Sequence, residues 1–343
     1  MSAAQGAMAT FEGGGVITIG SAPIGARPPE LVRIAVELCA LCGSDKRLLR
    51  AGAAITPGHE IAGTVLELPE QSAGLHVGQR VLVYIPLYCG ECELCAAGQT
   101  NRCLTFPPLV GWQRPGGFGT ILDLPARNLI AVPQDIDPVV SLLALDTIGT
   151  AAHGVGMCER ALGGTPERAA VVGCGPLGLG AIAVLRDHGA TVVASDPAPA
   201  RRAVGGALGA VVAAPAEAIR GTDAAGVLPA RGFPLVVEAS GSTAGRESAQ
   251  WLVRPGGAVL LLGESDEPVT FPATPRWRRT DVYTVRSFYF PLTEVAGNFA
   301  LLRRIGPRLA ASMCTLHDLS DLQSTFERFV AGELVKPVIA LQR

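Results

Sequence analysis

The chain has 343 residues, of which 48% are hydrophobic and 17% are charged, and its formal net charge is −2. This length suits two domains, and the nearly balanced charge argues against nucleic acid or an anionic membrane as a partner. The N-terminal residues lack a basic segment followed by an apolar run, so we expect no secretory signal and a cytoplasmic protein.

Short apolar or alternating runs fill the first part of the chain, and clusters of glycine and proline separate them. This pattern predicts a compact, barrel-like antiparallel module. The predicted strands cover residues 31–39, 61–68, 79–85 and 119–124.

From about residue 149, short apolar strands alternate with helical segments, a pattern typical of parallel βαβ units. Residues 169–185 are long and apolar enough to suggest a membrane span, but their glycines and Pro176 favour a buried strand, a tight turn and a helix. A closing strand is predicted at 280–288. Two helical segments and a final strand follow, and we expect them to pack back on the first module. The predicted fold class is therefore α/β, with a β-rich domain beside a doubly wound parallel sheet.

Four of the nine cysteines fall within fifteen residues, in the order C-x2-C-x2-C-x7-C. Disulfides are disfavoured in a reducing compartment, and this spacing is typical of a zinc site. Four sulfur ligands leave no open coordination position, so the predicted zinc is structural. The loop spans residues 86–110, and the ligands are Cys89, Cys92, Cys95 and Cys103.

A glycine-rich turn follows the first strand of the parallel part. Gly173, Gly175 and Gly178 have the G-x-G-x-x-G spacing, and Pro176 and Leu177 open the helix that follows. In this context the glycines permit a tight turn, close approach of a pyrophosphate and close packing of helix on strand. The turn predicts a dinucleotide cofactor.

Asp196 ends the next predicted strand, 18 residues after Gly178. An acid at this place accepts hydrogen bonds from the adenosine ribose and repels a 2′-phosphate, which favours NAD over NADP. Arg201 and Arg202 keep NADP as an alternative.

Two further motifs are "CGSD" at 42–45 and "GHE" at 58–60. With the cysteine loop, the glycine turn, "GGFG", "LDTIGTAAHGV" and "KPVIAL", they make the chain resemble the zinc-dependent medium-chain alcohol/polyol dehydrogenases. The resemblance runs in the family's order from about Met8, and residues 1–7 look like an extension. It implies a GroES-like catalytic domain of residues 1–148 and 289–343, and a Rossmann NAD-binding domain of residues 149–288. It also implies a homodimer or homotetramer built through the cofactor domain.

The same resemblance assigns the residues of a catalytic zinc site. It makes Cys42 and His59 zinc ligands and Glu60 the acid behind the metal. Asp146, seven residues before His153, would be the third ligand, although a helix N-cap acid is the alternative reading.

Two neighbouring polar residues receive roles in proton transfer and orientation. Ser44 would take the proton of the substrate hydroxyl, and Asp45 would orient His59. Arg47 stands where some relatives place a proton-relaying histidine, so the exit route of the proton is undetermined.

The loop after the cysteines borders the substrate cleft in this family. Trp112, Gln113 and Arg114 can therefore line it, together with Lys46 and Arg47. Several hydrogen-bond donors at the entrance of one cleft suit a polyol, sugar alcohol or cyclitol as substrate, phosphorylated or not. A solvated loop is the alternative.

The sequence thus predicts an oxidoreductase that transfers a hydride between NAD(H) and a secondary alcohol or ketone, with two zinc ions per chain. A zinc-free enone or quinone reductase of the same superfamily and a non-enzymatic zinc-ribbon module are the rival readings. Metal analysis separates them, because the rivals predict only one zinc.

Overall fold

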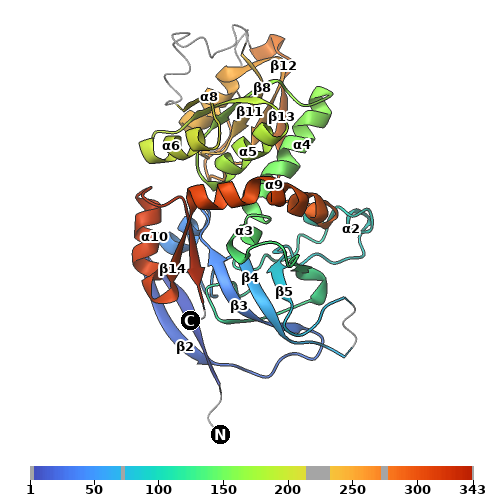
Figure 1. Cartoon of the computed structure of the whole chain (residues 1–343), viewed down its shortest axis with the longest axis vertical. Helices are drawn as coiled ribbons and strands as arrows, with labels where there is room; N and C mark the ends of the chain where they lie inside the picture. Colours follow the sequence, from blue (N-terminus) through green and yellow to red (C-terminus); the bar gives the residue numbers. More distant parts are fainter. Residues whose placement is uncertain (1–3, 71–73, 214–231, 272–276, 342–343) are drawn as a thin grey trace. The chain divides into compact units, whose positions relative to one another are not determined.

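The computed structural model describes residues 4–70, 74–213, 232–271 and 277–341 (Figure 1). The chain divides into two compact units. Unit 1 comprises Met1–Leu145, Pro291–Thr293 and Cys314–Arg343, and unit 2 comprises Asp146–Phe290 and Glu294–Met313. Among the described helices, none combines the length and the hydropathy that a bilayer crossing requires.

Unit 1 is built on a seven-stranded sheet in the order β14-β15-β3-β4-β5-β7, with β6 also paired to β3. The central strand β3 is rich in branched apolar residues and buried along almost its whole length, as expected for a strand covered on both faces. The strands are β3 (Val32–Ala40), β4 (Glu60–Glu67), β5 (Arg80–Val83), β6 (Ile121–Leu124), β7 (Leu129–Ala131), β14 (Cys314–Asp318) and β15 (Lys336–Ala340).

A hairpin of β1 (Gln5–Gly13) and β2 (Val16–Pro23) precedes this sheet. The sequence did not predict this hairpin. The expectation that residues 1–7 form an extension is corrected, because β1 begins at Gln5. Phe11 of β1 is buried and packs on Phe118 and Phe326, with ring centroids 5.9 and 5.7 Å away. The hairpin therefore shares the core of unit 1 with the C-terminal segment.

Short helices complete unit 1. Helix α3 begins after Asp137, whose carboxylate accepts the backbone N–H groups of Val139 and Val140. The helices are α1 (Asp45–Ala51), α2 (Glu93–Ala96), α3 (Pro138–Leu142) and α10 (Leu322–Val330). Short 3-10 turns in the chain are Thr100–Arg102, Ala126–Asn128, Trp277–Arg279, Leu292–Glu294 and Leu319–Asp321.

Unit 2 contains a six-stranded parallel sheet in the order β10-β9-β8-β11-β12-β13. Numbered from β8 this is 3-2-1-4-5-6, the order of a doubly wound dinucleotide-binding sheet, so the predicted parallel fold is confirmed. The strands are β8 (Arg168–Val172), β9 (Thr191–Ser195), β10 (Val212–Ala213), β11 (Phe233–Glu238), β12 (Val253–Leu261) and β13 (Tyr283–Arg286).

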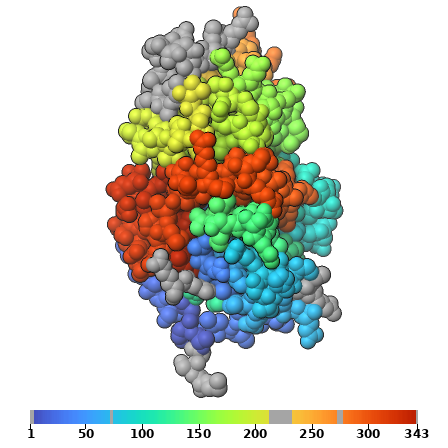
Figure 2. All heavy atoms as spheres, in the orientation of Figure 1, coloured from blue at the N-terminus to red at the C-terminus, as the bar shows by residue number. Residues whose placement is uncertain are grey.

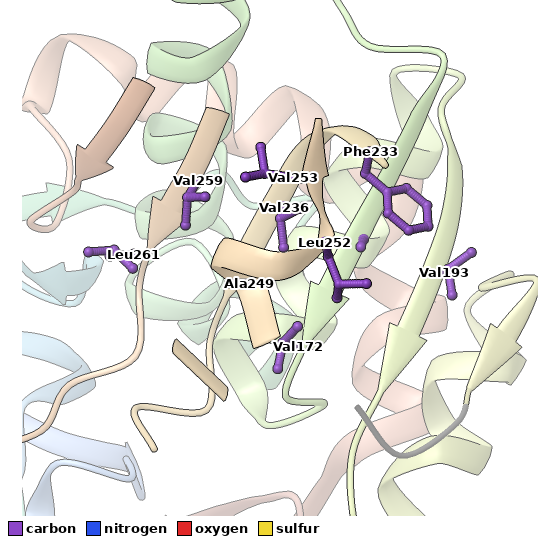
Figure 3. Packing of buried hydrophobic residues seen from close by; sticks show 10 residues of the cluster. Val172, Val193, Phe233, Val236, Ala249, Leu252, Val253, Val259 and Leu261 are labelled. Atoms are coloured by element: carbon purple, nitrogen blue, oxygen red, sulfur yellow. The ribbon is translucent and has the colours of Figure 1, made fainter. Parts of the chain in front are cut away.

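A buried apolar cluster of unit 2 lies between this sheet and helix α8 (Thr243–Leu252), as Figure 3 shows. The Ser242 hydroxyl begins α8 by accepting the backbone N–H of Gly245. The buried apolar cluster contains Ala170, Val172, Val193, Phe233, Val236, Ala249, Leu252, Val253, Val259 and Leu261.

Among the described residues of unit 2, the other helices are α4 (Ala151–Leu162), α5 (Pro176–Asp187), α6 (Pro199–Ala207) and α9 (Val295–Met313), and a π-helical turn covers Asp146–Thr150. The sequence assigned residues 289–343 to the first module as one block. The compact units divide this block differently, because α9 packs on α5 and α6 whereas the segment from Cys314 joins the sheet of unit 1.

Candidate metal and cofactor sites

The cysteine loop of unit 1 brings the sulfur atoms of Cys89, Cys92, Cys95 and Cys103 within 4.8 Å of one another. The sulfur of Cys89 lies 3.9 Å from that of Cys95 and 3.5 Å from that of Cys103. A tetrahedral zinc with Zn–S bonds of about 2.3 Å requires sulfur–sulfur distances of roughly 3.8 Å. The four residues therefore fit a closed zinc site. Their loop is marked by α2 in Figure 1, and its teal atoms are visible at the surface in Figure 2.

Local hydrogen bonds favour thiolates in this loop. Burial opposes ionisation of Cys103, but the N–H of Cys89 and the hydroxyl of Thr105 donate to its sulfur, and its pKa falls to about 6. Burial raises the pKa of Cys95 to about 12. A bound cation is what would allow all four sulfurs to be deprotonated together.

A second group of possible metal ligands in unit 1 is formed by Cys42, His59 and Glu60, which offer one ligand atom each within 4.8 Å of one another. Strands β3 and β4 are antiparallel, and Ala40 pairs with Glu60. Cys42, just beyond the end of β3, is thereby brought beside the start of β4. Asp146 directly follows the last residue of the first segment of unit 1 and opens the π-helical turn.

The turn before His59 requires glycine. Gly58 has a φ of +98°, and a Cβ atom there would lie 2.7 Å from the Cys39 sulfur and 2.9 Å from the Phe118 nitrogen. Only a residue without a side chain fits this backbone.

Asp45 is fully buried beside these ligands. Its Oδ1 lies 3.1 Å from Nδ1 of His59, and its Oδ2 accepts the backbone N–H of Cys42 at 2.9 Å. A carboxylate at Nδ1 directs the other ring nitrogen toward a metal. Ser44 lies next to Asp45, and its hydroxyl is 3.3 Å from the Cys42 sulfur.

Glu60 and Lys336 form an ion pair in which both side chains are fully buried. Nζ of Lys336 also donates to the carbonyl of Leu41 at 3.3 Å. The sequence alone indicated no role for this lysine. The available signal was a lysine at the start of the otherwise apolar run "KPVIAL".

The glycine turn of unit 2 lies between β8 and α5. Gly173 has a φ of +99°, and a Cβ at Gly178 would lie 1.8 Å from the carbonyl oxygen of Gly173. At Gly175 an added Cβ would meet no atom within 4 Å. Pro176 and Leu177 form the first turn of α5, with Pro176 at a position that needs no N–H donor.

Asp196 lies directly after β9 and is 5% exposed. Its carboxylate accepts the backbone N–H groups of Cys174 and Ala198, both at 2.8 Å, so it ties the glycine turn to the end of β9. Each carboxylate oxygen has a further lone pair for a ribose hydroxyl. Arg202 donates to the carbonyl of Asp196 at 2.7 Å, whereas Nε of Arg201 is buried with no hydrogen-bond partner among the described residues.

The three predicted substrate residues differ in their surroundings. Trp112 is half-buried, and its ring centroid lies 5.7 Å from that of His59. Gln113 and Arg114 are exposed, and the Gln113 side chain accepts the N–H of Leu109 in its own loop. Trp112 therefore lies beside His59.

The chain matches two family models, "Alcohol dehydrogenase GroES-like domain" over residues 28–134 and "Zinc-binding dehydrogenase" over residues 176–298. These matches confirm the predicted GroES-like and Rossmann α/β fold classes.

In two curated relatives, the region that matches this chain covers more than two thirds of the relative's length. L-galactonate-5-dehydrogenase of Escherichia coli is 30% identical over 290 residues, which are 82% of each chain. L-threonine 3-dehydrogenase of Legionella pneumophila is 34% identical over 242 residues, 68% of this chain and 69% of the relative.

Solved structures agree with this result. An alcohol dehydrogenase from Thermus is 27% identical, with a TM-score of 0.83 and coverage of 97% of this chain and 99% of its own. A structure from Sinorhizobium meliloti with bound NADP shows the same fold at 23% identity, with a TM-score of 0.84 and coverage of 98% and 99%. The protein is an oxidoreductase of hydride transfer, and the chain belongs to the zinc-dependent medium-chain alcohol/polyol dehydrogenase family.

Proposed function

We propose that the protein oxidises a secondary alcohol in a polyol, sugar alcohol or cyclitol, phosphorylated or not, with a catalytic zinc and NAD. The observation that carries this proposal is the convergence of three ligand atoms in unit 1, from Cys42, His59 and Glu60, within 4.8 Å. A thiolate, an imidazole and carboxylates are a donor set that zinc accepts. The similarity to enzymes named for L-galactonate and L-threonine, both hydroxylated acids, supports a polar substrate.

Cys42, His59 and Asp146 are the proposed ligands, and three protein ligands leave one position open for the alcohol. Glu60 is the proposed acid behind the metal, and its carboxylate is paired with buried Lys336. Bound zinc supplies a Lewis acid that lowers the pKa of the substrate hydroxyl.

The residues beside the ligands transfer the proton of the substrate hydroxyl and orient the His59 ring. Ser44 Oγ, which is adjacent to the Cys42 sulfur, accepts a hydrogen bond from the substrate hydroxyl and takes its proton as it releases its own hydroxyl proton to water. Asp45 acts as a positioning residue, since its carboxylate faces Nδ1 of His59 and leaves Nε2 for the metal.

The glycine turn holds the cofactor in this proposal. Gly173 and Gly178 form the tight turn, and Gly175 lets the backbone approach the pyrophosphate. Asp196 accepts a ribose hydroxyl and disfavours a 2′-phosphate. Bound NAD supplies the hydride acceptor. Arg201 makes NADP the alternative that the assay must exclude.

The second zinc is held by Cys89, Cys92, Cys95 and Cys103, so we expect two zinc ions per chain. We also propose a homo-oligomer that assembles through unit 2. Strand β13 forms an edge of the described sheet, and Tyr283 and Phe288 near this edge are 50% and 44% exposed. An exposed strand edge can pair with another copy of the chain.

Elemental analysis and an NADH-formation assay test the proposal together. The purified protein should contain about two zinc ions per chain and should reduce NAD, but not NADP, with one class among polyols, cyclitols, their phosphates and simple secondary alcohols. The proposed specificity requires that class to be polyhydroxylated.

Matched cysteine variants separate the two metals. Cys42→Ser should lose activity and one zinc, Cys103→Ser should lose the other zinc, and Cys158→Ser, a buried cysteine of α4, should keep both. A wild-type protein with one zinc that reduces enones or quinones would instead support the zinc-free reductase.

A further inference from the structure

We propose that the substrate carries an oxyanion group, a carboxylate or a phosphate, and that Arg47 binds this group while Trp112 positions Arg47. The inference rests on the proposed function and specifies its substrate class. It would make Arg47 a specificity residue of the alcohol dehydrogenase site.

The geometry that carries the inference is a chain of three neighbouring side chains in unit 1, His59, Trp112 and Arg47. The ring of His59, a proposed zinc ligand, lies 5.7 Å from the ring of Trp112. The guanidinium carbon of Arg47 lies over the same indole ring, 5.0 Å from its centroid. Trp112 therefore lies between the proposed metal ligand and a positive charge.

Helix α1 directs only one of its two neighbouring cations to this place. Consecutive helical residues point about 100° apart around the axis. Lys46 accordingly lies over the ring of Phe329 in α10, with Nζ 5.3 Å from the centroid, whereas Arg47 lies over Trp112. The sequence alone treated both residues as equal donors.

The chemistry of arginine fits an oxyanion at this position. Its planar guanidinium binds a carboxylate or phosphate through two parallel N–H···O bonds. The cation–π contact with Trp112 restricts the long arginine side chain before the ligand arrives. Arginine stays charged throughout the accessible pH range and so cannot relay a proton as histidine does. At position 47, anion binding by arginine therefore takes the place of proton relay by histidine.

The test compares substrates that differ only in charge. A hexonate, a hexitol phosphate and the neutral hexitol of the same configuration are assayed with wild-type protein, Arg47→Gln and Lys46→Gln. We expect the wild type to prefer an anionic substrate, and the two anionic arms identify which oxyanion it binds. Arg47→Gln should reduce the ratio of kcat/KM for anionic over neutral substrate by roughly 10- to 100-fold, mainly through KM. Lys46→Gln removes the same charge from the same helix and should leave this ratio unchanged.

Trp112 is tested by its conservative variant. Trp112→Ala should raise KM for the anionic substrate although Arg47 is intact, and Trp112→Phe, which restores an aromatic face, should recover most of the loss. Calorimetric binding of the anionic substrate to the protein with NADH bound gives a readout without turnover and should weaken in the same order.

Two results would overturn the inference while the proposed function stands. One is a wild type that oxidises the neutral hexitol as efficiently as both anions, and the other is an Arg47→Gln protein with an unchanged ratio. Inactivity of zinc-loaded wild type on all polyhydroxylated compounds would instead reject the proposed function, and the inference with it.

Discussion

Glu60 and Lys336 are two fully buried charges that meet across 276 positions of the sequence. Removing two charges from water costs about as much as their attraction returns, so an intact buried pair adds little net stability. Loss of one member is different, because the other charge remains buried without compensation. The pair therefore fixes the carboxylate beside His59 more than it stabilises the fold.

We predict that Lys336→Met lowers the free energy of unfolding by about 3–5 kcal/mol. The double variant Lys336→Met with Glu60→Gln should recover most of this loss, since no charge is left unpaired. Guanidinium unfolding of the zinc-loaded proteins measures both values. A double variant as unstable as the single one would show that lost packing, not lost charge compensation, is the cause.

At the scale of elements, the turn between β8 and α5 assigns different tasks to its glycines. A Cβ at Gly178 would collide with the Gly173 carbonyl, so this glycine serves the close packing of helix on strand. A Cβ at Gly175 would meet open space, and its φ of −74° suits any residue. None of the described residues requires glycine at 175, which leaves close approach of the cofactor as its reason.

We therefore predict that substitution of Gly175 mainly weakens cofactor binding, whereas substitution of Gly178 mainly lowers stability. Gly175→Ala should weaken NADH binding by at least roughly 10-fold, because the methyl group occupies the approach of the pyrophosphate, and should lower stability by less than about 1 kcal/mol. Gly178→Ala should lower stability by about 1–3 kcal/mol or more because of overpacking. NADH fluorescence titration and thermal unfolding measure the two effects.

Gly206→Ala is the control, since it lies on α6 with no atom within 4 Å of an added Cβ. It should leave NADH affinity unchanged. Unaltered affinity in Gly175→Ala would contradict the assignment of the pyrophosphate to this turn.

At the scale of the whole molecule, the proposed assembly through unit 2 gives a mass that can be measured. Sedimentation equilibrium should find two or four chains of 35.4 kDa. Tyr283→Asp places a charge at the exposed edge beside β12 and should shift the protein toward the monomer.

Val16→Asp is a matched control, because Val16 in unit 1 is also 50% exposed. It should leave the mass unchanged. A wild type that sediments as a monomer would reject the assembly, and dissociation by Val16→Asp alone would move the interface to unit 1.

Features contained in short stretches of sequence were predictable. The spacing of four cysteines within fifteen residues was enough to predict a metal loop, because the ligands are joined by short turns that glycine permits. The G-x-G-x-x-G turn after an apolar strand predicted a parallel dinucleotide-binding sheet, and the strand order confirms the fold. Cys42, His59 and Asp146 were named through a family resemblance, since residues so far apart in the sequence show no spacing rule of their own.

Tertiary structure alone decided which distant residues meet. The register of β3 on β4 brings Cys42 to His59, and the antiparallel pairing of β15 with β3 delivers Lys336 to Glu60. The orientation of α1 separates Arg47 from Lys46, although the sequence gives them equal charge and adjacent positions. The physical reason is that local sequence determines turns and periodicity, whereas contacts between distant side chains depend on strand register and on the rotation of each helix against its neighbours.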